Sequence, residues 1–447
     1  MGAHCFRDFV SLLDAEGQLV HLTRPVAEKY EAAALMKFTS GKTPMVMEHV
    51  GSTGVPLVSG IGGTRGLIAQ SVGCGERNLD SVLADAIASP LTNVQFRGSA
   101  PVQQVRRKAP FDLSALMPIL TFNEGDVGPF VVSSMMVARS DDGSREYTSV
   151  RRMQYLGGNR LTVLITSREM REQFERYERR HQPMDVAFVL GVTPSMLLAS
   201  QISTHLYDCD KLAVAGALVG EPVPVCRCLT VDVDVPAEAE FVLEGHVLGW
   251  EKVTEGPFGE MGGYYGTVSE RPVVELTCVT SRQDPLAQLV FPSGYEEKLP
   301  MGIAREVGLL ATVRQTVPGV CAAYITPPTL GRLHAVIQIH KEAPFDGKQA
   351  ALAAFASDKD LKHVVVVDDD VDPQDPEQVE WAIATRMQAD RDVVIIPGCN
   401  GSPLEASHVE RGMTAKMGLD ATYKHGDPIY RRTHVPGEES VRIEDYL

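Results

Sequence analysis

Between about residues 111 and 300 the sequence is dominated by short segments in which apolar and polar residues alternate. Such alternation is typical of β-strands with one buried face, and turn residues separate the segments. A single amphipathic helix, expected over 168–181, interrupts this pattern. A chain with so many consecutive strands is expected to form a β-barrel or a strongly curved sheet. The predicted strands contain VVSSMMVA, REYTSVRRMQYL, RLTVLIT, LTVDVDV, AEFVLEGHVLG and VVELTCVTS.

The regions on either side of this strand-rich part mix helices and strands. Residues 1–108 carry both signals, which predicts an N-terminal α/β domain. At its end, 98-GSAPVQQVRRKAP-110 is small, polar and basic, and we interpret it as a linker. From about residue 301 helical segments alternate with strands, which predicts a parallel or mixed sheet covered by helices. The predicted organisation is therefore α/β (α+β, multidomain), with the barrel over 109–300 and a C-terminal α/β domain over 301–447.

Composition limits the partners of the chain. Its 447 residues carry a formal net charge of −16, which argues against nucleic acid or an anionic membrane as a partner. No apolar run approaches the roughly 18 residues that span a bilayer, and the start MGAHCFRDFV lacks the apolar core of a signal peptide. The eight cysteines form no Cys-x-x-Cys pair, so we expect reduced thiols rather than a zinc ribbon, in a cytoplasmic protein.

The segment 254-TEGPFGEMGGYYG-266 holds two carboxylates, Glu255 and Glu260, on either side of a Gly-Pro-Phe-Gly turn. Glycine and proline together favour a shaped loop over a helix or a central strand. Loops held by a rigid scaffold often carry catalytic residues. The segment is therefore either a catalytic loop or a solvated turn with two surface acids.

Arg151 and Arg152 lie inside the strand-like run 147-YTSVRRMQY-155. Because successive strand residues point to opposite faces, at least one of these arginines is expected to point into the barrel and to need an anion there. Arg152 beside Glu255 and Glu260 would form an acid–base cluster, in which arginine holds a carboxylate and a buried glutamic acid delivers a proton. A structural salt-bridge network is the alternative at this stage.

Several collinear stretches resemble the UbiD-type decarboxylases, a family that uses prenylated FMN. The resemblance covers almost the whole chain and implies an N-terminal α/β portion, a central split β-barrel that holds flavin, and a C-terminal α/β domain. The segment 292-PSGYEE-297 resembles the branch with furan-dicarboxylate and anhydromevalonate-phosphate decarboxylases. The other matching stretches are EGPFGE with GYY, Arg152-Met-Gln, MDVAFVLGVTPSMLLAS, AGALVGEPVPV, VPAEAEFVLEG, EWAIATRMQAD and TAKMGLDAT.

The resemblance assigns Arg152, Glu255 and Glu260 to a Glu-Arg-Glu catalytic network. It implies non-oxidative decarboxylation of an α,β-unsaturated or (hetero)aromatic carboxylic acid, in which the modified flavin takes up the electrons and Glu260 protonates the carbon. The implied partners are the acid substrate, a flavin prenyltransferase that supplies the cofactor, and further copies of the chain in a dimer or hexamer. The implied cofactor-binding residues are Val150, Arg151, Arg152, Arg168, Lys211 and Lys416.

One departure from the family concerns metal ions. The family's flavin phosphate is bridged by a manganese-type divalent ion and potassium, but the matching ligand positions here are Tyr147, Glu169 and Lys211. Tyrosine and lysine are weak ligands for a hard cation, so we assign no metal ligands. Either Lys211 replaces the ion, or the chain is a non-catalytic or plain-FMN-binding subunit of a multi-component (de)carboxylase. Glu169 as the acid of a capping box, and Lys211 in a surface pair with Asp208 or Asp210, are the structural alternatives.

Overall fold

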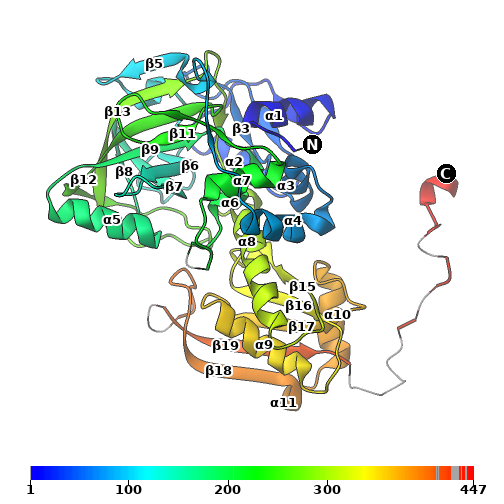
Figure 1. The fold of residues 1–447 in the computed structure, drawn as a ribbon. Helices are drawn as coiled ribbons and strands as arrows, with labels where there is room; N and C mark the ends of the chain where they lie inside the picture. The colour runs from blue at the N-terminus through cyan, green and yellow to red at the C-terminus, as the bar shows by residue number, and fades with distance from the viewer. Residues whose placement is uncertain are drawn as a thin grey trace.

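The structure is a computed structural model that describes residues 2–204, 206–408, 410, 412–423, 432–433, 435–437 and 440–446. A β-barrel and an N-terminal α/β region form one part of the molecule, and a five-stranded sheet with its helices forms the other (Figure 1). Among the described residues no helix is both long and apolar enough to cross a membrane.

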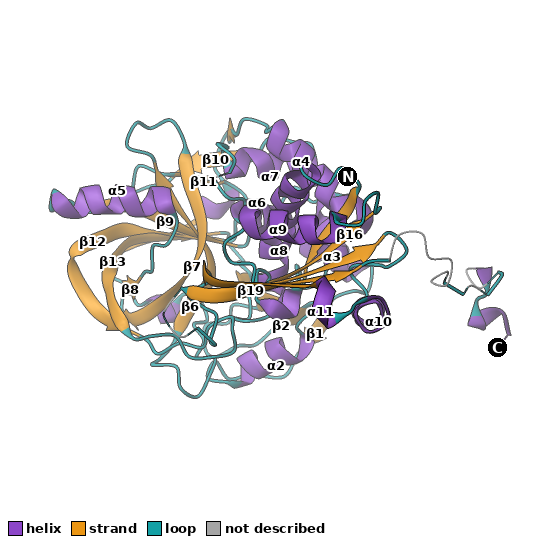
Figure 2. Cartoon of the chain, turned by 90° about the horizontal axis from the view of Figure 1, so that it is seen from below, coloured by secondary structure: helices purple, strands orange, loops and turns teal. Residues whose placement is uncertain are grey.

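Six strands close into the predicted barrel, in the order β12-β9-β6-β7-β8-β13, and β13 pairs back onto β12. Their alternation buries one face around a core that includes Phe130, Phe188 and Phe241. Figure 2 shows these strands curving around one another, with helix α5 (Arg168–Arg179) along the outside. The prediction of a barrel is confirmed, and its strands are β6 (Phe130–Arg139), β7 (Glu146–Gly157), β8 (Arg160–Thr162), β9 (Met184–Leu190), β12 (Phe241–Glu255) and β13 (Ser269–Ser281).

The interpretation of residues 98–110 as a linker is wrong. Residues Pro101–Gln103 form a short 3-10 helix, and β5 (Val105–Lys108) pairs antiparallel with β13 at the edge of the barrel sheet. The polar, basic sequence reflects an exposed edge strand, because residues 106–108 face solvent.

The N-terminal region packs several helices around a small sheet of the order β1-β2-β3-β14. A second small sheet, β11-β10-β4, lies beside the barrel. The elements are α1 (Phe6–Ala15), β1 (Val20–Leu22), α2 (Glu31–Thr39), β2 (Met45–Met47), β3 (Leu57–Ser59), α3 (Arg65–Val72), α4 (Leu79–Ala88), β4 (Val94–Gln95), α6 (Pro194–Ser200), α7 (Lys211–Val219), β10 (Pro224–Arg227), β11 (Asp234–Pro236) and β14 (Ala287–Gln288).

The C-terminal domain contains a mixed sheet of the order β15-β16-β17-β19-β18, in which β16, β17 and β19 run parallel. Alternate strand residues face opposite layers: Val364 and Val366 pack with α9, whereas Val365 and Val367 pack with α10. This arrangement confirms the predicted mixed sheet covered by helices. The elements are β15 (Val320–Ile325), β16 (His334–Ile339), α9 (Asp346–Ser357), β17 (His363–Asp368), α10 (Pro376–Arg386), α11 (Ala389–Asp392), β18 (Val393–Asn400) and β19 (Met413–Ala421).

Helix α8 (Tyr295–Arg314) lies between the two parts of the molecule (Figure 1). Its buried Glu296 accepts hydrogen bonds from the backbone N–H groups of Gly60 (2.6 Å) and Gly62 (3.0 Å). Its buried Glu306 pairs with Arg65 at 2.7 Å and accepts from the N–H of Ile325, at the end of β15. Two buried carboxylates on one helix therefore join the N-terminal region to the C-terminal sheet.

Candidate active site

The three residues singled out in the sequence converge at one place in the barrel. Arg152 on β7 approaches Glu260 through two nitrogens, with Nη2 at 2.9 Å from Oε1 and Nη1 at 3.3 Å from Oε2. The same Nη2 lies 3.4 Å from Oε1 of Glu255, the last residue of β12. The side chain of Glu255 is only 2% exposed, whereas those of Arg152 and Glu260 are 21% and 20% exposed. One arginine thus holds two carboxylates in a largely buried cluster, which excludes the interpretation as a solvated turn.

The loop between β12 and β13 is shaped to present Glu260. Gly256 follows Glu255 directly and has a φ of +93°, a conformation that residues with a Cβ rarely adopt. A Cβ on Gly266 would lie 2.6 Å from Oε1 of Glu260, so the glycine leaves room for the carboxylate. The loop is fastened to a neighbouring turn, because Asp126 accepts from the N–H of Gly259 at 2.8 Å.

Three further residues contact the cluster, and one of them, Thr162, comes from another strand. Thr162 on β8 donates its hydroxyl hydrogen bond to Oε2 of Glu255. Gln154, two residues beyond Arg152, accepts from the N–H of Gly256 at 3.3 Å. The guanidinium of Arg152 also stacks over the ring of Phe258, at 4.8 Å from its centroid. Only the barrel closure brings Thr162 here, so no local sequence signal could have identified it.

The surroundings of Glu260 favour its protonated form. Burial raises the pKa of Glu260, and the neighbouring Glu255 carboxylate raises it further, while Arg152 opposes both effects. Glu297, on α8, is a further acid within electrostatic range of Glu260, and burial raises its pKa too. The quoted segment PSGYEE contains Glu297, but its role was not apparent from the sequence. A carboxyl with a raised pKa beside a carboxylate held by arginine is suited to proton delivery.

Arg151 has a different environment from its neighbour Arg152. Its Nη1 donates to the carbonyl of Val150 at 3.0 Å, while its buried Nε and Nη2 have no hydrogen-bond partner in the described part of the chain. Burial, with the nearby charge of Arg152, lowers the pKa of Arg151 to about 10. Val150 itself packs against the apolar core between the barrel and helices α6 and α7. A buried guanidinium with free donors is a fitting partner for an anion.

The three positions that depart from the family pattern line a single cavity of about 170 Å³. Tyr147 comes from the start of β7, Glu169 from the first turn of α5, and Lys211 from the first turn of α7. Lys211 donates from Nζ to the backbone carbonyls of Ser200 (2.8 Å) and Thr148 (3.2 Å). Burial lowers the pKa of Lys211 to about 8, and the charge of Arg151 contributes to this effect.

The structural alternatives for these residues are both wrong. Lys211 forms no surface pair, because Asp208 pairs with Arg145 and Asp210 caps α7 by accepting from Leu212 and Ala213 N–H groups. The predicted capping box at α5 is also absent, since the N-cap Ser167 makes no side-chain capping hydrogen bond. Glu169 instead accepts from the hydroxyl of Thr204 at 2.6 Å.

Lys211 in the wall of this cavity and Arg151 near it fit an anion better than a divalent cation. In the part of the chain that the structure describes, no three His, Cys, Asp or Glu side chains gather in an arrangement that could hold a metal ion. The ammonium of Lys211 also carries positive charge where a divalent cation would have to lie. The free donors of Arg151 and the ammonium of Lys211, in contrast, fit the phosphate of a flavin mononucleotide.

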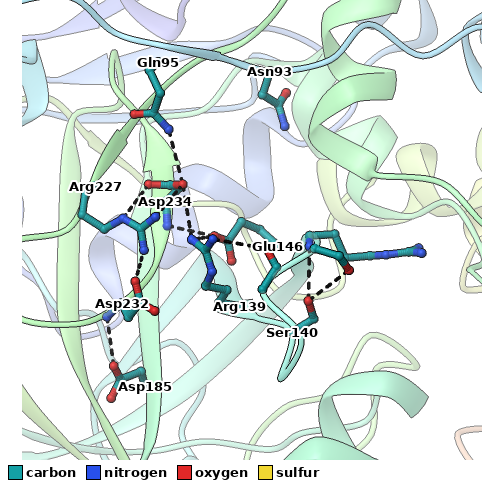
Figure 3. A network of polar contacts seen from close by, with 12 residues as sticks. Asn93, Gln95, Arg139, Ser140, Glu146, Asp185, Arg227, Asp232 and Asp234 are labelled. Carbon is teal, nitrogen blue, oxygen red and sulfur yellow. Dashed lines mark hydrogen bonds and ion pairs between the residues drawn. The ribbon is translucent and has the colours of Figure 1, made fainter.

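A network of ion pairs fixes the start of β7 next to this cavity (Figure 3). Glu146, which lines the cavity, lies 3.4 Å from Arg139 and accepts from the N–H of Asp234 at 3.1 Å. Asp234 in turn pairs with Arg227 at 2.9 Å and accepts from Gln95 at 3.4 Å. Burial raises the pKa of Glu146 to about 7. The network joins strands of the barrel and the small sheet, and so holds one wall of the cavity.

Two of the predicted cofactor-binding residues lie apart from these clusters. The side chain of Arg168 is 65% exposed and pairs with Glu172 one turn along α5. Lys416, on β19, donates to the carbonyls of Lys359 and Leu361 inside the C-terminal domain. The structure thus brings Arg152, Glu255 and Glu260 together at one site and links Arg151 to Lys211, but it places neither Arg168 nor Lys416 with them.

Comparison with known proteins identifies the family. Three models of the 3-octaprenyl-4-hydroxybenzoate carboxy-lyase (UbiD) match in order: the N-terminal domain at residues 10–87, the Rift-related domain at 94–295 and the C-terminal domain at 298–421. The chain therefore belongs to the UbiD family of carboxy-lyases. The resemblance noted in the sequence, and the fold that it implied, are confirmed.

Individual relatives cover nearly the whole chain. The anhydromevalonate phosphate decarboxylase of Methanothermobacter thermautotrophicus is 33% identical over 93% of this chain and 96% of its own length. The UbiD-class enzyme HmfF from Pelotomaculum thermopropionicum, solved in complex with FMN, is 40% identical with a TM-score of 0.96, over 99% of this chain and 100% of its own. An evolved dimeric form of HmfF, solved with prFMN, is 38% identical with a TM-score of 0.91, over the full length of both chains.

Proposed function

We propose that this chain is a decarboxylase that acts on an α,β-unsaturated or (hetero)aromatic carboxylic acid with prenylated FMN as cofactor. The observation that carries the proposal is the convergence of Glu255 and Glu260 on Arg152 in a largely buried cluster. The solved complexes of HmfF with FMN and prFMN support the choice of cofactor. The relatives named as anhydromevalonate phosphate decarboxylases support the class of reaction.

Arg152 is suited to orient the substrate carboxylate. Its two terminal nitrogens hold the glutamates, but its buried Nε has no partner among the described residues. That free donor, in a largely buried cluster, can take a carboxylate oxygen of the substrate. Glu255 keeps the guanidinium in place, since it is held from its other side by Thr162.

Glu260 supplies the proton that replaces the departing carbon dioxide. When bound, prenylated FMN provides the electron sink that no side chain of this site offers. Glu260 is more exposed than Glu255 and lies on the glycine-rich loop, so its carboxyl is the one of the two that can reach a bound ligand. Its raised pKa favours the protonated form, which must carry the proton at Oε1 or Oε2 before it is transferred.

The wider assignments belong to the same proposal. We propose a flavin prenyltransferase as the supplier of the cofactor, assembly of the chain into dimers or hexamers, and action in the cytoplasm. The eight cysteines are all free thiols in the structure, and five of them are buried, which suits a reducing compartment. The evolved dimeric form of HmfF supports a dimer as one of these assemblies.

The test is to purify the full chain after co-expression with a flavin prenyltransferase and to record its visible spectrum. A flavin-loaded protein that releases carbon dioxide from at least one acid in a panel of enoic, aromatic and furanoic acids is the expected result. A protein that stays colourless with either FMN or prenylated FMN would overturn the proposal. A protein that binds plain FMN alone, and releases no carbon dioxide, would favour the role of a subunit in a multi-component (de)carboxylase.

A further inference from the structure

Two buried cations, Arg151 and Lys211, lie within electrostatic range of each other. Among the described residues no ion pair joins either Arg151 or Lys211 to a carboxylate, although Glu169 is within electrostatic range of Lys211. Burial lowers the pKa of both side chains, and each residue's environment contains a second positive charge. Burial of two like charges is unfavourable unless an anion balances them, so the arrangement favours the binding of an anion.

The surroundings of the Lys211 ammonium are those of a bound cation. Its Nζ lies between two backbone carbonyl oxygens, those of Thr148 and Ser200. The carboxylate of Glu169 is within electrostatic range and favours the charged form of Lys211. Carbonyl and carboxylate oxygens are the donors that hard metal ions prefer. Here the ammonium of Lys211 supplies the positive charge that these carbonyl and carboxylate oxygens attract.

We propose that Lys211 takes the place of a metal ion in this site, and that Lys211 and Arg151 together bind the flavin's phosphate without a divalent cation. The inference rests on the proposed function, because it requires that the chain binds a flavin mononucleotide. It assigns the cavity lined by Tyr147, Glu169 and Lys211 to the phosphate end of that cofactor.

Charge and space both suit a phosphate group. A phosphomonoester carries about −1.5 to −2 charges at neutral pH, which matches one ammonium and one guanidinium. Arg151 is not part of the cavity wall but lies within electrostatic range of Lys211, and its unpaired Nε and Nη2 form the kind of fork that binds two oxygens of one anion. A cavity of about 170 Å³ accommodates such a group together with ordered water. Two of the acids that line the cavity contact other cations, since Glu146 pairs with Arg139 and Asp208 pairs with Arg145. The third, Glu169, accepts a hydrogen bond from Thr204 and is within electrostatic range of Lys211.

The first experiment uses the unmodified protein. Full-length, flavin-loaded protein is dialysed against EDTA, and its flavin and its metal content are measured by absorbance and by mass spectrometry of the elements. We expect flavin to be retained without stoichiometric manganese, and the dissociation constant for FMN to be the same in EDTA and in manganese with potassium. Stoichiometric manganese, or loss of flavin in EDTA, would overturn the inference.

The second experiment separates binding of the phosphate from a structural role of Lys211. Dissociation constants are measured for FMN and for riboflavin, which lacks the phosphate. Loss of one charge-assisted contact is expected to weaken FMN binding to Lys211→Met about 10- to 100-fold, and to leave riboflavin binding unchanged. Equal weakening of both ligands would indicate a structural role and overturn the inference. Arg171→Met is the control, because Arg171 is an exposed cation on the helix that lines the cavity.

A third variant reverses the charge at the same position. Lys211→Glu places a carboxylate among the carbonyl oxygens of Thr148 and Ser200, next to Glu169. We expect FMN binding by this variant to depend on added manganese. The wild type is the control, and its FMN binding should not change when manganese is added. A variant that is indifferent to manganese would contradict the idea that the ammonium occupies a cation's place. Failure of the wild-type chain to bind any flavin would instead overturn the proposed function.

Discussion

Two consecutive arginines on β7 have opposite environments. Arg152 contacts the carboxylates of Glu255 and Glu260, so its charge is compensated by the protein itself. Arg151 has no carboxylate within ion-pair distance among the described residues, and two of its three nitrogens lack a hydrogen-bond partner. The difference teaches that the charge of Arg152 is balanced within the protein, as proton-transfer chemistry requires, whereas the charge of Arg151 is balanced only when an anion is bound.

The largest expected effect tests the cluster of Arg152, Glu255 and Glu260. Glu260→Gln keeps the shape of the side chain but removes the transferable proton, so we expect kcat to fall by about 10²- to 10⁴-fold. Flavin content should remain unchanged, because Glu260 is not at the proposed phosphate cavity. Carbon dioxide release with the flavin-loaded variant is the measurement. Activity within a few fold of the wild type would remove Glu260 from the proposed role.

Arg152→Met tests whether Arg152 is also the main electrostatic support of its cluster. The change leaves Glu255 buried without its cationic partner, and loss of one member of a buried ion pair costs about 3 kcal/mol. We expect the midpoint of urea unfolding to fall for the flavin-free protein, and Arg152→Lys should recover part of the loss. A midpoint equal to that of the wild type would show that the pair contributes no stability.

The dependence of the rate on pH sharpens the assignment of the acid. Burial raises the pKa of Glu260, and only the protonated carboxyl can deliver the proton. Once the pH exceeds this pKa, kcat is expected to fall about tenfold per pH unit, since the protonated fraction falls in that proportion. This fall of kcat with rising pH should be absent from the residual activity of Glu260→Gln. A rate that rises through the same range would assign Glu260 the role of a base.

The smallest expected effect concerns Arg151, whose charge no carboxylate of the described residues balances. Arg151→Met removes a buried charge that lacks a counter-ion, so the flavin-free protein should be no less stable than the wild type. Binding of FMN should weaken about tenfold through the loss of one charge-assisted contact. Urea unfolding and fluorescence titration with FMN give the two values. A loss of stability as large as that of Arg152→Met would abolish the contrast between the two arginines.

The sequence supported the barrel and the reacting trio because both depend on local patterns. Alternation of apolar residues identifies strands, and the acids lie on a segment whose glycines and proline already predict a shaped loop. The prediction failed where a strand carries no apolar face, as in β5, whose exposed polar residues were interpreted as a linker. It also failed at the start of α5, where the acid of the expected capping box bonds to Thr204 instead.

Contacts between distant segments could not be predicted from the sequence. Thr162 reaches Glu255 only because six strands close into a barrel, and Glu297 comes within electrostatic range of Glu260 from a separate element, α8. The family resemblance singled out Tyr147, Glu169 and Lys211 as departures from the family pattern. Only the structure shows that these residues line one cavity. The domain limits and the roles of Arg168 and Lys416 in cofactor binding stay predictions.

The catalytic loop does not belong to the barrel alone. A Cβ on Gly262 would lie 3.4 Å from the carbonyl oxygen of Leu404 and 3.6 Å from the side chain of Leu330, both in the C-terminal domain. Glu297 lies on α8, between the two parts of the molecule, and its own pKa is raised by burial and further by the charge of Glu260. The loop that carries the proton donor therefore borders on segments outside the barrel. A chimera that combines this barrel with another member's C-terminal domain would repack that loop, although its catalytic trio would be unchanged.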